Sequence, residues 1–363
     1  MPKGCFQNIV VKGIASAVPD NKRDTADWYE TFGRENVEKF VKMTGVQSIF
    51  KSGEKQTASD LAFVAARKLL EKKNVPPQDV GALVFVTQAP DYRLPATACV
   101  LQHRLGLSED CICFDVNLGC SGYVNGLTIL ASLMESSDTD KGLLLVGDTS
   151  TKGISGDDKS SAMLFGDSGA ATLLCKEVHS DSTIQYHLRT DGNRFKAIIK
   201  PAGAYRNRNA SPERVLWNVD GNIRSDYETY MNGADVFSFS ISDVPKLIRE
   251  FFKDTETSVD DYDCFALHQA NLYILRQIAK KMKIPQEKML VSMDRFGNTS
   301  VTSIPLTLAK FYGDDDDSHI NALMCGFGVG LSWGVVTAKI EKKDILPMIY
   351  TNEFFQDGGV END

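Results

Sequence analysis

Cys120 is placed where a cysteine could act as a nucleophile. In the segment DVNLGCSGYVNGL it follows an apolar strand-like run, stands between Gly119 and Gly122, and precedes a helical pattern. A thiol at a helix N-terminus feels the positive end of the helix dipole, which favours the thiolate. The glycines would let a substrate approach closely. A small structural cysteine at a strand–helix junction would show the same pattern, so this segment alone leaves both interpretations open.

Two further polar residues stand at the ends of apolar or turn segments. His268 in FALHQAN closes an apolar strand and precedes a helix, and open α/β sheets place ligand sites at the carboxyl ends of their strands. Asn298 in DRFGNTSVTSIPLTL lies in a Gly-Asn turn, with Thr299 or Ser300 as the cap of a following helix. Alone, His268 fits a half-buried structural histidine equally well, and the turn favours a structural asparagine.

The glycine-rich run GFGVGLSWG (326–334) could expose backbone amides. Amides in a tight turn can form an oxyanion hole, although they can also simply close a hairpin. The turn joins strand to strand rather than strand to helix, so it is not a dinucleotide-binding fingerprint.

These residues are spread over alternating strand and helix patterns. Apolar residues recur at helical spacing over 57–73, and further helices are expected at 122–136 and 271–282. Buried strands are expected at 80–90, 111–117, 141–150 and 169–175, with two more in 320–340. This alternation predicts an α/β fold with parallel or mixed sheets.

A change to polar sequence near residue 176 predicts two halves, 1–176 with the cysteine and 177–363 with the histidine and asparagine. Residues 194–230, rich in Arg, Asn, Gly and Pro, are expected to form a long surface excursion within the second half.

The whole-chain composition excludes several classes of protein. The net charge of −8 argues against general nucleic-acid binding, which needs a basic face. Neither a signal peptide nor a run of about 20 apolar residues is evident, so no membrane association is expected. The eight cysteines form no C-x-x-C pair, which predicts a reducing, cytoplasmic setting and no metal site.

The motifs taken together, in their order, are far more specific than any one of them. Cys120 in DVNLGCSG, HQAN at 268–271, GNTS at 297–300 and GFGVG at 326–330 resemble the β-ketoacyl-acyl-carrier-protein synthase III family of thiolase-fold condensing enzymes. The segments at 82–107, 163–174 and 330–336 add to the resemblance. It implies two duplicated halves in a layered αβαβα arrangement, a homodimer with the strand at 111–117 near its twofold axis, and no cofactor of its own.

The resemblance also implies roles for particular residues. Cys120 would carry the acyl group, while His268 and Asn298 would polarise a malonyl thioester; the backbone amides of Cys120 and Val329 would bind the oxyanion. Asn271 and Gly233 match pantetheine contacts, and Phe327 and Leu164 match residues near the acyl pocket. Lys280 and Lys281 match a basic pair that docks an acyl carrier protein.

The chain departs from this family pattern at the donor site. Lys39 and Met43 stand where relatives hold the coenzyme A adenine with Trp and Arg, and Tyr273 replaces a docking Arg. The donor could therefore be a coenzyme A or an acyl-carrier-protein thioester, and a specialised member is expected. Basic residues of the excursion could rebuild a docking face, or could simply be solvated: Arg194, Lys196, Lys200, Arg206, Arg208 and Arg214.

Three other functions are compatible with parts of the pattern. An acyltransferase of the same fold would form an ester or amide without decarboxylation, although Asn298 argues mildly against it. A non-catalytic acyl-binding scaffold would have no need for all three polar residues. A cysteine protease shares the Cys–His–Asn order but not the neighbourhood of the cysteine.

Overall fold

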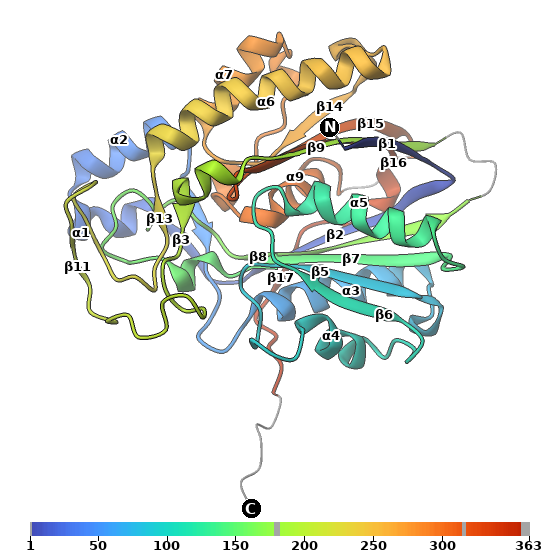
Figure 1. The fold of residues 1–363 in the computed structure, drawn as a ribbon, viewed down its shortest axis with the longest axis horizontal. Helices are drawn as coiled ribbons and strands as arrows, with labels where there is room; N and C mark the ends of the chain where they lie inside the picture. The colour runs from blue at the N-terminus through green and yellow to red at the C-terminus, as the bar shows by residue number, and fades with distance from the viewer. Residues whose placement is uncertain (1, 178–181, 314–316, 357–363) are drawn as a thin grey trace, which may run out of the picture.

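Five alternating layers of helices and sheets make up the computed structural model, which describes residues 2–177, 182–313 and 317–356 (Figure 1). From one outer face to the other they are α6 and α7, a five-stranded sheet, α5 and α9, a six-stranded sheet, and α3 and α4. The αβαβα arrangement expected from the sequence is therefore confirmed.

Both sheets are mixed, and both are covered on their two faces. The strand order is β17-β2-β8-β7-β5-β6 in the larger sheet and β1-β9-β16-β15-β14 in the smaller one. Strands β6, β5 and β7 are parallel, as are β14 and β15. Strands β5, β7 and β14 are buried along nearly their whole length, so they are mostly apolar runs rather than alternating ones. Their bounds are β1 Lys3–Gln7, β2 Ile9–Pro19, β5 Ala82–Val86, β6 Ile112–Val116, β7 Lys141–Asp148, β8 Ser168–Lys176, β9 Thr183–Thr190, β14 Cys264–Leu267, β15 His319–Gly328, β16 Ser332–Glu341 and β17 Ile349–Thr351.

The helices predicted from apolar periodicity are present. The predicted helix 57–73 is α3, which begins after Thr57, whose backbone N–H donates to Oδ2 of Asp60 at 2.8 Å. The long helices are α3 Ala58–Lys73, α4 Thr97–Leu105, α5 Gly122–Glu135, α6 Gly233–Thr255, α7 Leu272–Met282 and α9 Ser303–Tyr312, and α2 Arg34–Thr44 packs beside α7. Short pieces are α1 Tyr29–Phe32, α8 Met293–Phe296, β3 Lys22–Asp24 and β4 Ser48–Phe50.

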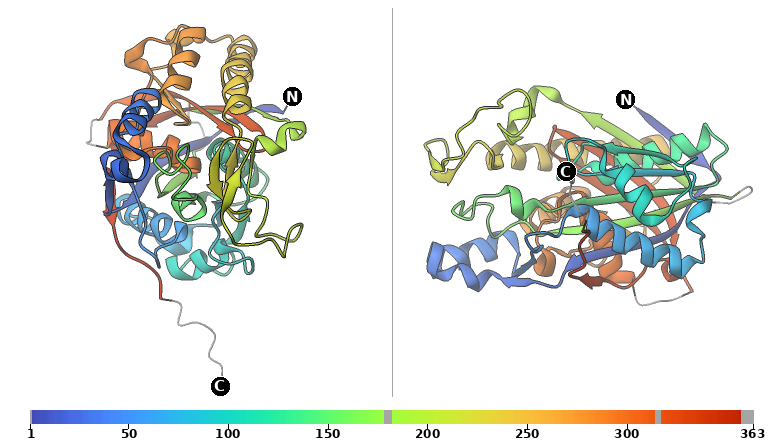
Figure 2. Two further views of the ribbon diagram at one scale, coloured as in Figure 1. Left: turned by 90° about the vertical axis from the view of Figure 1, so that its left-hand side faces the viewer. Right: turned by 90° about the horizontal axis from the view of Figure 1, so that it is seen from below.

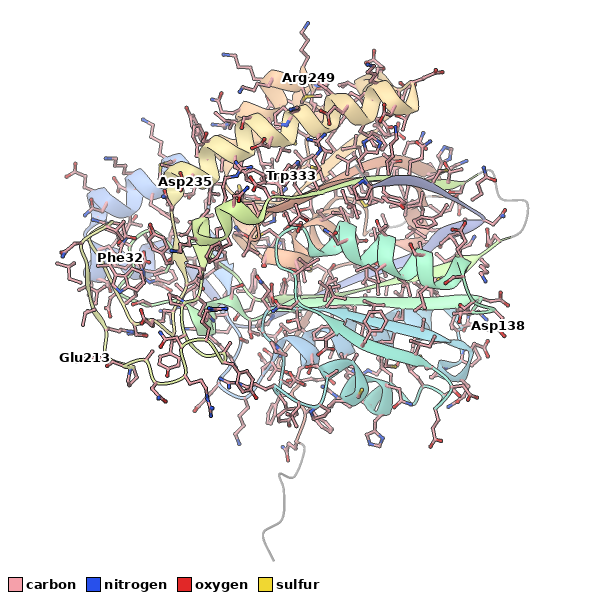
Figure 3. All side chains as sticks on the ribbon, in the orientation of Figure 1. Phe32, Asp138, Glu213, Asp235, Arg249 and Trp333 are labelled. Atoms are coloured by element: carbon pink, nitrogen blue, oxygen red, sulfur yellow. The ribbon has the colours of Figure 1, made fainter. Side chains whose placement is uncertain are left out.

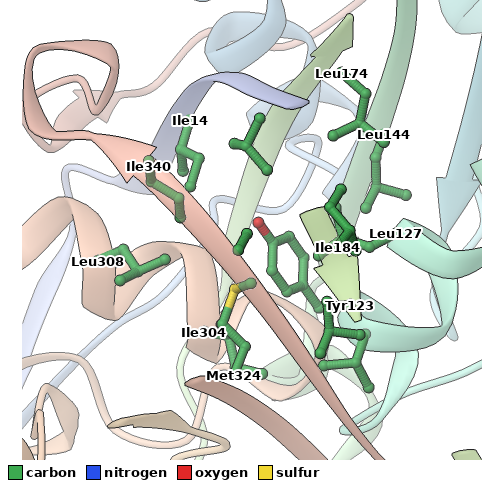
Figure 4. Packing of buried hydrophobic residues seen from close by; sticks show 14 of the residues in the cluster. Ile14, Tyr123, Leu127, Leu144, Leu174, Ile184, Ile304, Leu308, Met324 and Ile340 are labelled. Carbon is green, nitrogen blue, oxygen red and sulfur yellow. The ribbon is translucent and has the colours of Figure 1, made fainter. Parts of the chain in front are cut away.

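Helix α5 carries the central core because it lies between the two sheets. Its buried residues include Tyr123 and Leu127, which pack with Met324 of β15 and Leu144 of β7 (Figure 4). The hydroxyl of Tyr123 meets Oγ1 of Thr172 at 3.0 Å, which satisfies its polar end inside this core. A helix packed on both sides in this way holds its N-terminus, and so Cys120, in a fixed position.

The sheets exchange their terminal strands across the predicted boundary at 176/177. Strand β8 ends at Lys176, but β1 pairs with β9 in the smaller sheet and β17 pairs with β2 in the larger one. The division at 176/177 therefore remains a prediction. The larger sheet consists of strands from residues 1–176 except β17, and the smaller sheet consists of strands from residues 177–363 except β1.

The excursion at 194–230 is more ordered than a solvated loop. It lies at the same end of the layers as α1 and α2, where Figure 3 labels Glu213 and Phe32 (Figures 1 to 3). Strand β10, Ile198–Ile199, pairs with β13, Tyr230–Met231, and β11, Val215–Trp217, pairs with β12, Asn222–Arg224. Arg224 is 1% exposed and binds Asp158 at 2.6 Å and Asp220 at 2.8 Å, so a buried ion-pair cluster anchors the segment.

Candidate active site

Cys120 lies in the turn between β6 and α5, one residue before the N-cap Ser121. The N–H of Gly122 donates to the carbonyl of Gly119 at 2.6 Å, and Oγ of Ser121 meets Oγ of Ser332 at 2.7 Å. The hydroxyl contact ties the start of α5 to the beginning of β16. The cysteine is partly exposed, so it can be reached.

Burial has the largest effect on the acidity of the Cys120 thiol. The pKa of Cys120 is raised to about 11, chiefly by burial and further by the carboxyl of Asp148. Hydrogen bonds from the backbone N–H of Val329, the side chain of Ser300 and its own N–H lower it, but by less. Desolvation therefore opposes the stabilisation of the thiolate that is expected from the helix N-terminus.

The glycine-rich turn lies directly against the cysteine. A β-carbon on Gly328 would be 2.5 Å from Cβ of Cys120 and 2.9 Å from its Sγ, so only a hydrogen fits there. The next residue, Val329, directs its N–H to the sulfur. The two predicted oxyanion amides, those of Cys120 and Val329, therefore converge on one point.

His268 follows β14 and is 2% exposed. Its Nδ1 is 2.8 Å from Oγ of Ser303, and the ring meets that of Phe327 edge-on, with centroids 5.4 Å apart. Burial lowers the pKa of His268 to about 3, although a hydrogen bond to the carbonyl of Ser300 acts in the opposite direction. The imidazole is therefore neutral, with one N–H and one lone pair.

The backbone of Asn298 is fixed by hydrogen bonds through both its N–H and its carbonyl. Its N–H donates to the carbonyl of Leu164 at 2.8 Å, and its carbonyl accepts from the N–H of Gly166 at 3.1 Å. Its Oδ1 accepts from the N–H of Ser300 at 3.0 Å. With the amide oxygen bound in this way, the side chain has its Nδ2 hydrogens left to donate.

Ser300 touches all three predicted catalytic residues. Its N–H donates to Oδ1 of Asn298 at 3.0 Å, its carbonyl acts to raise the pKa of His268, and its side chain acts to lower the pKa of Cys120. Its φ of 51° is in the left-handed region, which is costly for a serine and is typically found where function demands it. The structure thus brings Cys120, His268 and Asn298 together around one residue.

Comparisons with known proteins decide the family. The family models for the 3-oxoacyl-[acyl-carrier-protein] synthase III and its C-terminal part match residues 114–192 and 252–340. A "Putative 3-oxoacyl-[acyl-carrier-protein] synthase 3" of Campylobacter jejuni is 31% identical, over 96% of this chain and 99% of that one. The chain belongs to the β-ketoacyl-[acyl-carrier-protein] synthase III family.

Other members of the synthase III family are similar over almost their whole length. The "Beta-ketoacyl-[acyl-carrier-protein] synthase III" of Rhizorhabdus wittichii is 30% identical over 92% of this chain and all of that one. The crystal structure of a 3-oxoacyl-(acyl-carrier protein) synthase from Burkholderia xenovorans superposes with a TM-score of 0.90, at 34% identity over 96% of this chain and 99% of that one. The predicted membership and the thiolase fold are both confirmed.

The substrate residues predicted from the synthase III pattern fall into two groups. Phe327 contacts the His268 ring and Leu164 binds the backbone of Asn298, so both adjoin the candidate active site. Asn271 caps α7, with its Oδ1 accepting from the N–H of Ile274 at 2.8 Å. Gly233 is the first residue of α6, and a β-carbon there would meet nothing within 4 Å. Their contacts with pantetheine remain predictions.

The two lysines predicted to dock an acyl carrier protein lie on helix α7. Lys280 and Lys281 are exposed at the end of α7, and Nζ of Lys281 donates to the carbonyl of Ile241 at 2.8 Å.

Within residues 2–177, 182–313 and 317–356, no group of three or more His, Cys, Asp and Glu side chains is arranged to hold a metal. In the same residues, no helix combines the length and hydropathy needed to cross a membrane.

An open pocket of about 360 Å³ lies beside the loop that carries Asn298. It includes Phe165, whose backbone forms a bridge with Asn298. Its lining includes Trp28, Lys51, Lys152 and Arg214, so an anionic or aromatic group would meet complementary chemistry there.

Sequence reasoning missed three residues of the site. Ser300 and Ser303 belong to the GNTSVTS segment, but were considered only as a helix cap or not at all. Asp148 ends strand β7 and is 3% exposed. An acidic residue that closes an apolar strand gives the same signal that singled out His268, and it could have been found in that way.

Proposed function

We propose that this chain catalyses acyl transfer from a thioester to Cys120, followed by decarboxylative condensation with a malonyl thioester to give a 3-ketoacyl thioester. The observation that supports this most is the arrangement around Ser300. It places a thiol, a neutral imidazole and a primary amide around one point, with two backbone N–H groups directed at the sulfur.

The first half-reaction would use the backbone amides. As the sulfur attacks the acyl thioester, the carbonyl oxygen becomes negative and is bound by the N–H groups of Cys120 and Val329. Removal of one such donor typically lowers the rate by about 10²–10³-fold. The acyl group is then held as a thioester on Cys120, which is covalent catalysis by an activated nucleophile.

The second half-reaction would use the two neutral donors. The malonyl thioester carbonyl accepts hydrogen bonds from Asn298 Nδ2 and from His268. The enolate formed as carbon dioxide leaves is stabilised by both, and its carbon attacks the acyl-cysteine. The single hydroxyl hydrogen of Ser303 has two acceptors within reach, Nδ1 of His268 at 2.8 Å and the carbonyl of Ser300 at 2.9 Å. When it is donated to Nδ1, the ring carries its own hydrogen on Nε2. This hydrogen is then available to the thioester only if the ring gives up its hydrogen bond to the carbonyl of Ser300.

The substrates would be phosphopantetheine thioesters, of coenzyme A or of an acyl carrier protein. The lysine and arginine side chains of the pocket beside Asn298 favour a phosphate-bearing arm. Met43 is 58% exposed on α2, where relatives hold adenine with Arg. Together with the anchored excursion, this supports a specialised rather than a housekeeping member.

We also propose a homodimer built on β6. This strand is an edge of the six-stranded sheet, and edge strands with exposed apolar residues tend to pair with another chain. Ile112 of β6 is 43% exposed, and Leu94, in the loop after β5, is 77% exposed. Light scattering should give about twice the mass of the chain, and a monomer would contradict the proposal.

Release of carbon dioxide separates the proposed reaction from its alternatives. Purified protein would be acylated and then given [3-¹⁴C]malonyl thioester, with Asn298→Ala as the matched variant. Labelled carbon dioxide and a 3-ketoacyl product that Asn298→Ala forms far more slowly would support condensation. Acyl transfer to an oxygen or nitrogen nucleophile without carbon dioxide would identify the ester- or amide-forming alternative. No acylation by any donor would indicate a binding scaffold.

A further inference from the structure

The chain continues past β17, which lies beside α3, and meets the loop that leads into this helix (Figure 1). This segment, residues 352–356, is exposed, but its backbone is held at defined points. The side-chain amide of Gln56 donates to the carbonyls of Thr351 and Glu353, both at 3.0 Å. Gln56 is 3% exposed, and its Oε1 has no hydrogen-bond partner within the residues that the structure describes. The two carbonyls therefore orient this amide, while its own oxygen stays unpaired.

Two further contacts fasten residues 352–356 to α3 and α4, and we call these residues the C-terminal strap. Nη2 of Arg67 donates to both carboxylate oxygens of Glu353, at 2.8 and 3.0 Å. The N–H of Phe355 donates to Oδ1 of Asp60 at 3.0 Å, and the Phe355 ring centroid lies 4.5 Å from the guanidinium of Arg104. Asp60 and Arg104 form an ion pair at 2.9 Å, with side chains 3% and 6% exposed, so the strap covers a buried charge pair.

The loop that the strap holds also binds Lys152, which lines the pocket beside Asn298. Nζ of Lys152 donates to the carbonyl of Glu54 at 2.7 Å and to that of Gln56 at 2.8 Å. An ammonium has three N–H donors, so one remains for a group in the pocket. Gln56 thus meets the strap with its side chain and Lys152 with its backbone.

One buried carboxylate fixes the other side of this pocket wall. Asp167 is 0% exposed and accepts from the N–H of Ser52 at 2.9 Å and from the N–H of Thr151 at 3.0 Å. It also accepts from the hydroxyls of both residues, at 2.6 and 2.7 Å. Thr151 directly precedes Lys152. The wall is therefore tied at Asp167 on one side and by the strap, through Gln56, on the other.

Lys152 is the cation of the pocket best prepared to bind an anion. Arg214 also lines the pocket, but it bonds Glu228 at 2.5 Å and Asp157 at 3.3 Å, so its charge is compensated. Lys51 is a further cation of the lining, but within the described residues its side chain makes no hydrogen bond that would hold it in place. Both partners of Lys152 are neutral carbonyls, so it is fixed and keeps its charge. A charge-assisted hydrogen bond from such an amine to phosphate is stronger than a neutral one.

We propose that Gln56 and the C-terminal strap position Lys152 to bind the phosphate of a phosphopantetheine arm. This rests on the proposed function, in which the substrate is a phosphopantetheine thioester. Coenzyme A and acyl carrier proteins both carry this phosphate, so the contact serves either donor. Lys152 is the residue that binds, and Gln56 is a positioning residue that acts through it.

A comparison of two ligands isolates the contribution of the phosphate. Phosphopantetheine and pantetheine differ only in that group, and calorimetry would give the Kd of each for the unacylated protein. Wild type should bind phosphopantetheine about tenfold more tightly than pantetheine, the size expected of a hydrogen bond to a charged group. Lys152→Met should lose most of this preference, and Lys152→Arg should retain it. The Kd of pantetheine should stay the same in both variants.

Gln56→Glu tests the strap, because it places a carboxylate oxygen where the amide donates to two carbonyls. The preference for phosphopantetheine should fall, and hydrogen–deuterium exchange should rise in peptides that cover residues 50–57. Gln78→Glu is the matched control. Gln78 is exposed and its Nε2 likewise donates to a backbone carbonyl, that of Gly106 at 2.7 Å, so this variant should behave as wild type.

A second strap variant avoids the burial of a new charge. Arg67→Met/Phe355→Ala alters only side chains that are 37% and 41% exposed, so the protein should fold while the strap is loosened. It should show the same fall in preference and the same rise in exchange. Should Gln56→Glu fail to fold, this double variant decides the question by the same criteria.

The proposal is supported if the wild-type preference for phosphopantetheine falls in Lys152→Met and in the strap variants, with faster exchange in the latter. It is overturned by a wild type without this preference, or by an unchanged preference in Lys152→Met or in a folded strap variant. Failure of the proposed function would look different, since wild type would then prefer phosphopantetheine yet take no acyl group from any thioester.

Discussion

Gly328 and Cys120 are in direct contact across the candidate active site. A β-carbon on Gly328 would lie 2.5 Å from Cβ of the cysteine, closer than two such atoms can approach. Gly328→Ala should therefore displace the thiol and lower the acylation rate by about 10²-fold, as misplacement of a reacting group by about 1 Å can do. Gly53→Ala is the matched control, since a β-carbon there meets nothing within 4 Å. Equal acylation of Gly328→Ala and wild type would show that this close approach is unimportant.

The pKa of His268 predicts how stability depends on pH. The group has a pKa near 6.5 when unfolded and about 3 when folded, so between these values the unfolded chain binds a proton that the folded one does not. The free energy of unfolding should therefore fall as pH drops below about 6.5, by at most about 1.4 kcal/mol per pH unit for this group. Urea unfolding at pH 7.5 and 5.0 should show a smaller loss in His268→Gln than in wild type. Equal losses in the two proteins would argue that His268 is not the group responsible.

Arg224 should hold the excursion in place. Arg224→Met would leave Asp158 buried without its partner, and removal of one member of a buried pair typically costs about 3–5 kcal/mol. Denaturant unfolding should show a loss of this size, and limited proteolysis should cut between residues 199 and 230. In the double variant Arg224→Met/Asp158→Leu, much of the stability should return, because no buried charge remains. The exposed Arg206→Met serves as the control, and an equal effect of Arg206→Met and Arg224→Met would contradict the account.

Lys280 and Lys281 should affect carrier-protein donors but not coenzyme A donors. Reversal of both charges to Glu should raise KM for an acyl-carrier-protein thioester by about tenfold or more, because an acidic carrier needs a basic face. KM for the coenzyme A thioester should be unchanged. Lys72→Glu, on α3 at the opposite face of the layers, is the control (Figure 1). A parallel rise in both KM values would place these lysines outside carrier docking.

The long elements were predictable because apolar periodicity is a local signal. The three candidate catalytic residues were singled out only by the order of their motifs along the chain and by the family resemblance that this order carries. Apolar periodicity marked α3, α5 and α7, and His268 and Cys120 could be recognised where strands end. The exchange of β1 and β17 between sheets could not be predicted, since strand pairing depends on contacts far apart in the chain. A motif likewise gives no measure of how deeply its residues are buried.

The acidity of Cys120 shows how little a motif reveals about the burial of its residues. Its position at the start of α5 was visible in the sequence, but its pKa is raised by burial, and residues far along the chain, among them Gly326 and Gly328 of β15, pack against it. The ion pairs of the excursion were not predictable for a related reason. Its basic residues look like a solvated face, yet Arg194 pairs with Asp243 and Arg214 with Glu228. Their partners are distant in sequence or lie in the excursion itself.

The most direct test of the account is the intact mass of the protein after incubation with a panel of acyl-coenzyme A and acyl-carrier-protein thioesters, with Cys120→Ala in parallel. The account predicts a wild-type adduct of one acyl group that Cys120→Ala lacks, and the preferred donor would identify the first substrate. An adduct that persists in Cys120→Ala, or none in folded wild-type protein with any donor, would contradict the assignment of Cys120 as the acyl-carrying nucleophile.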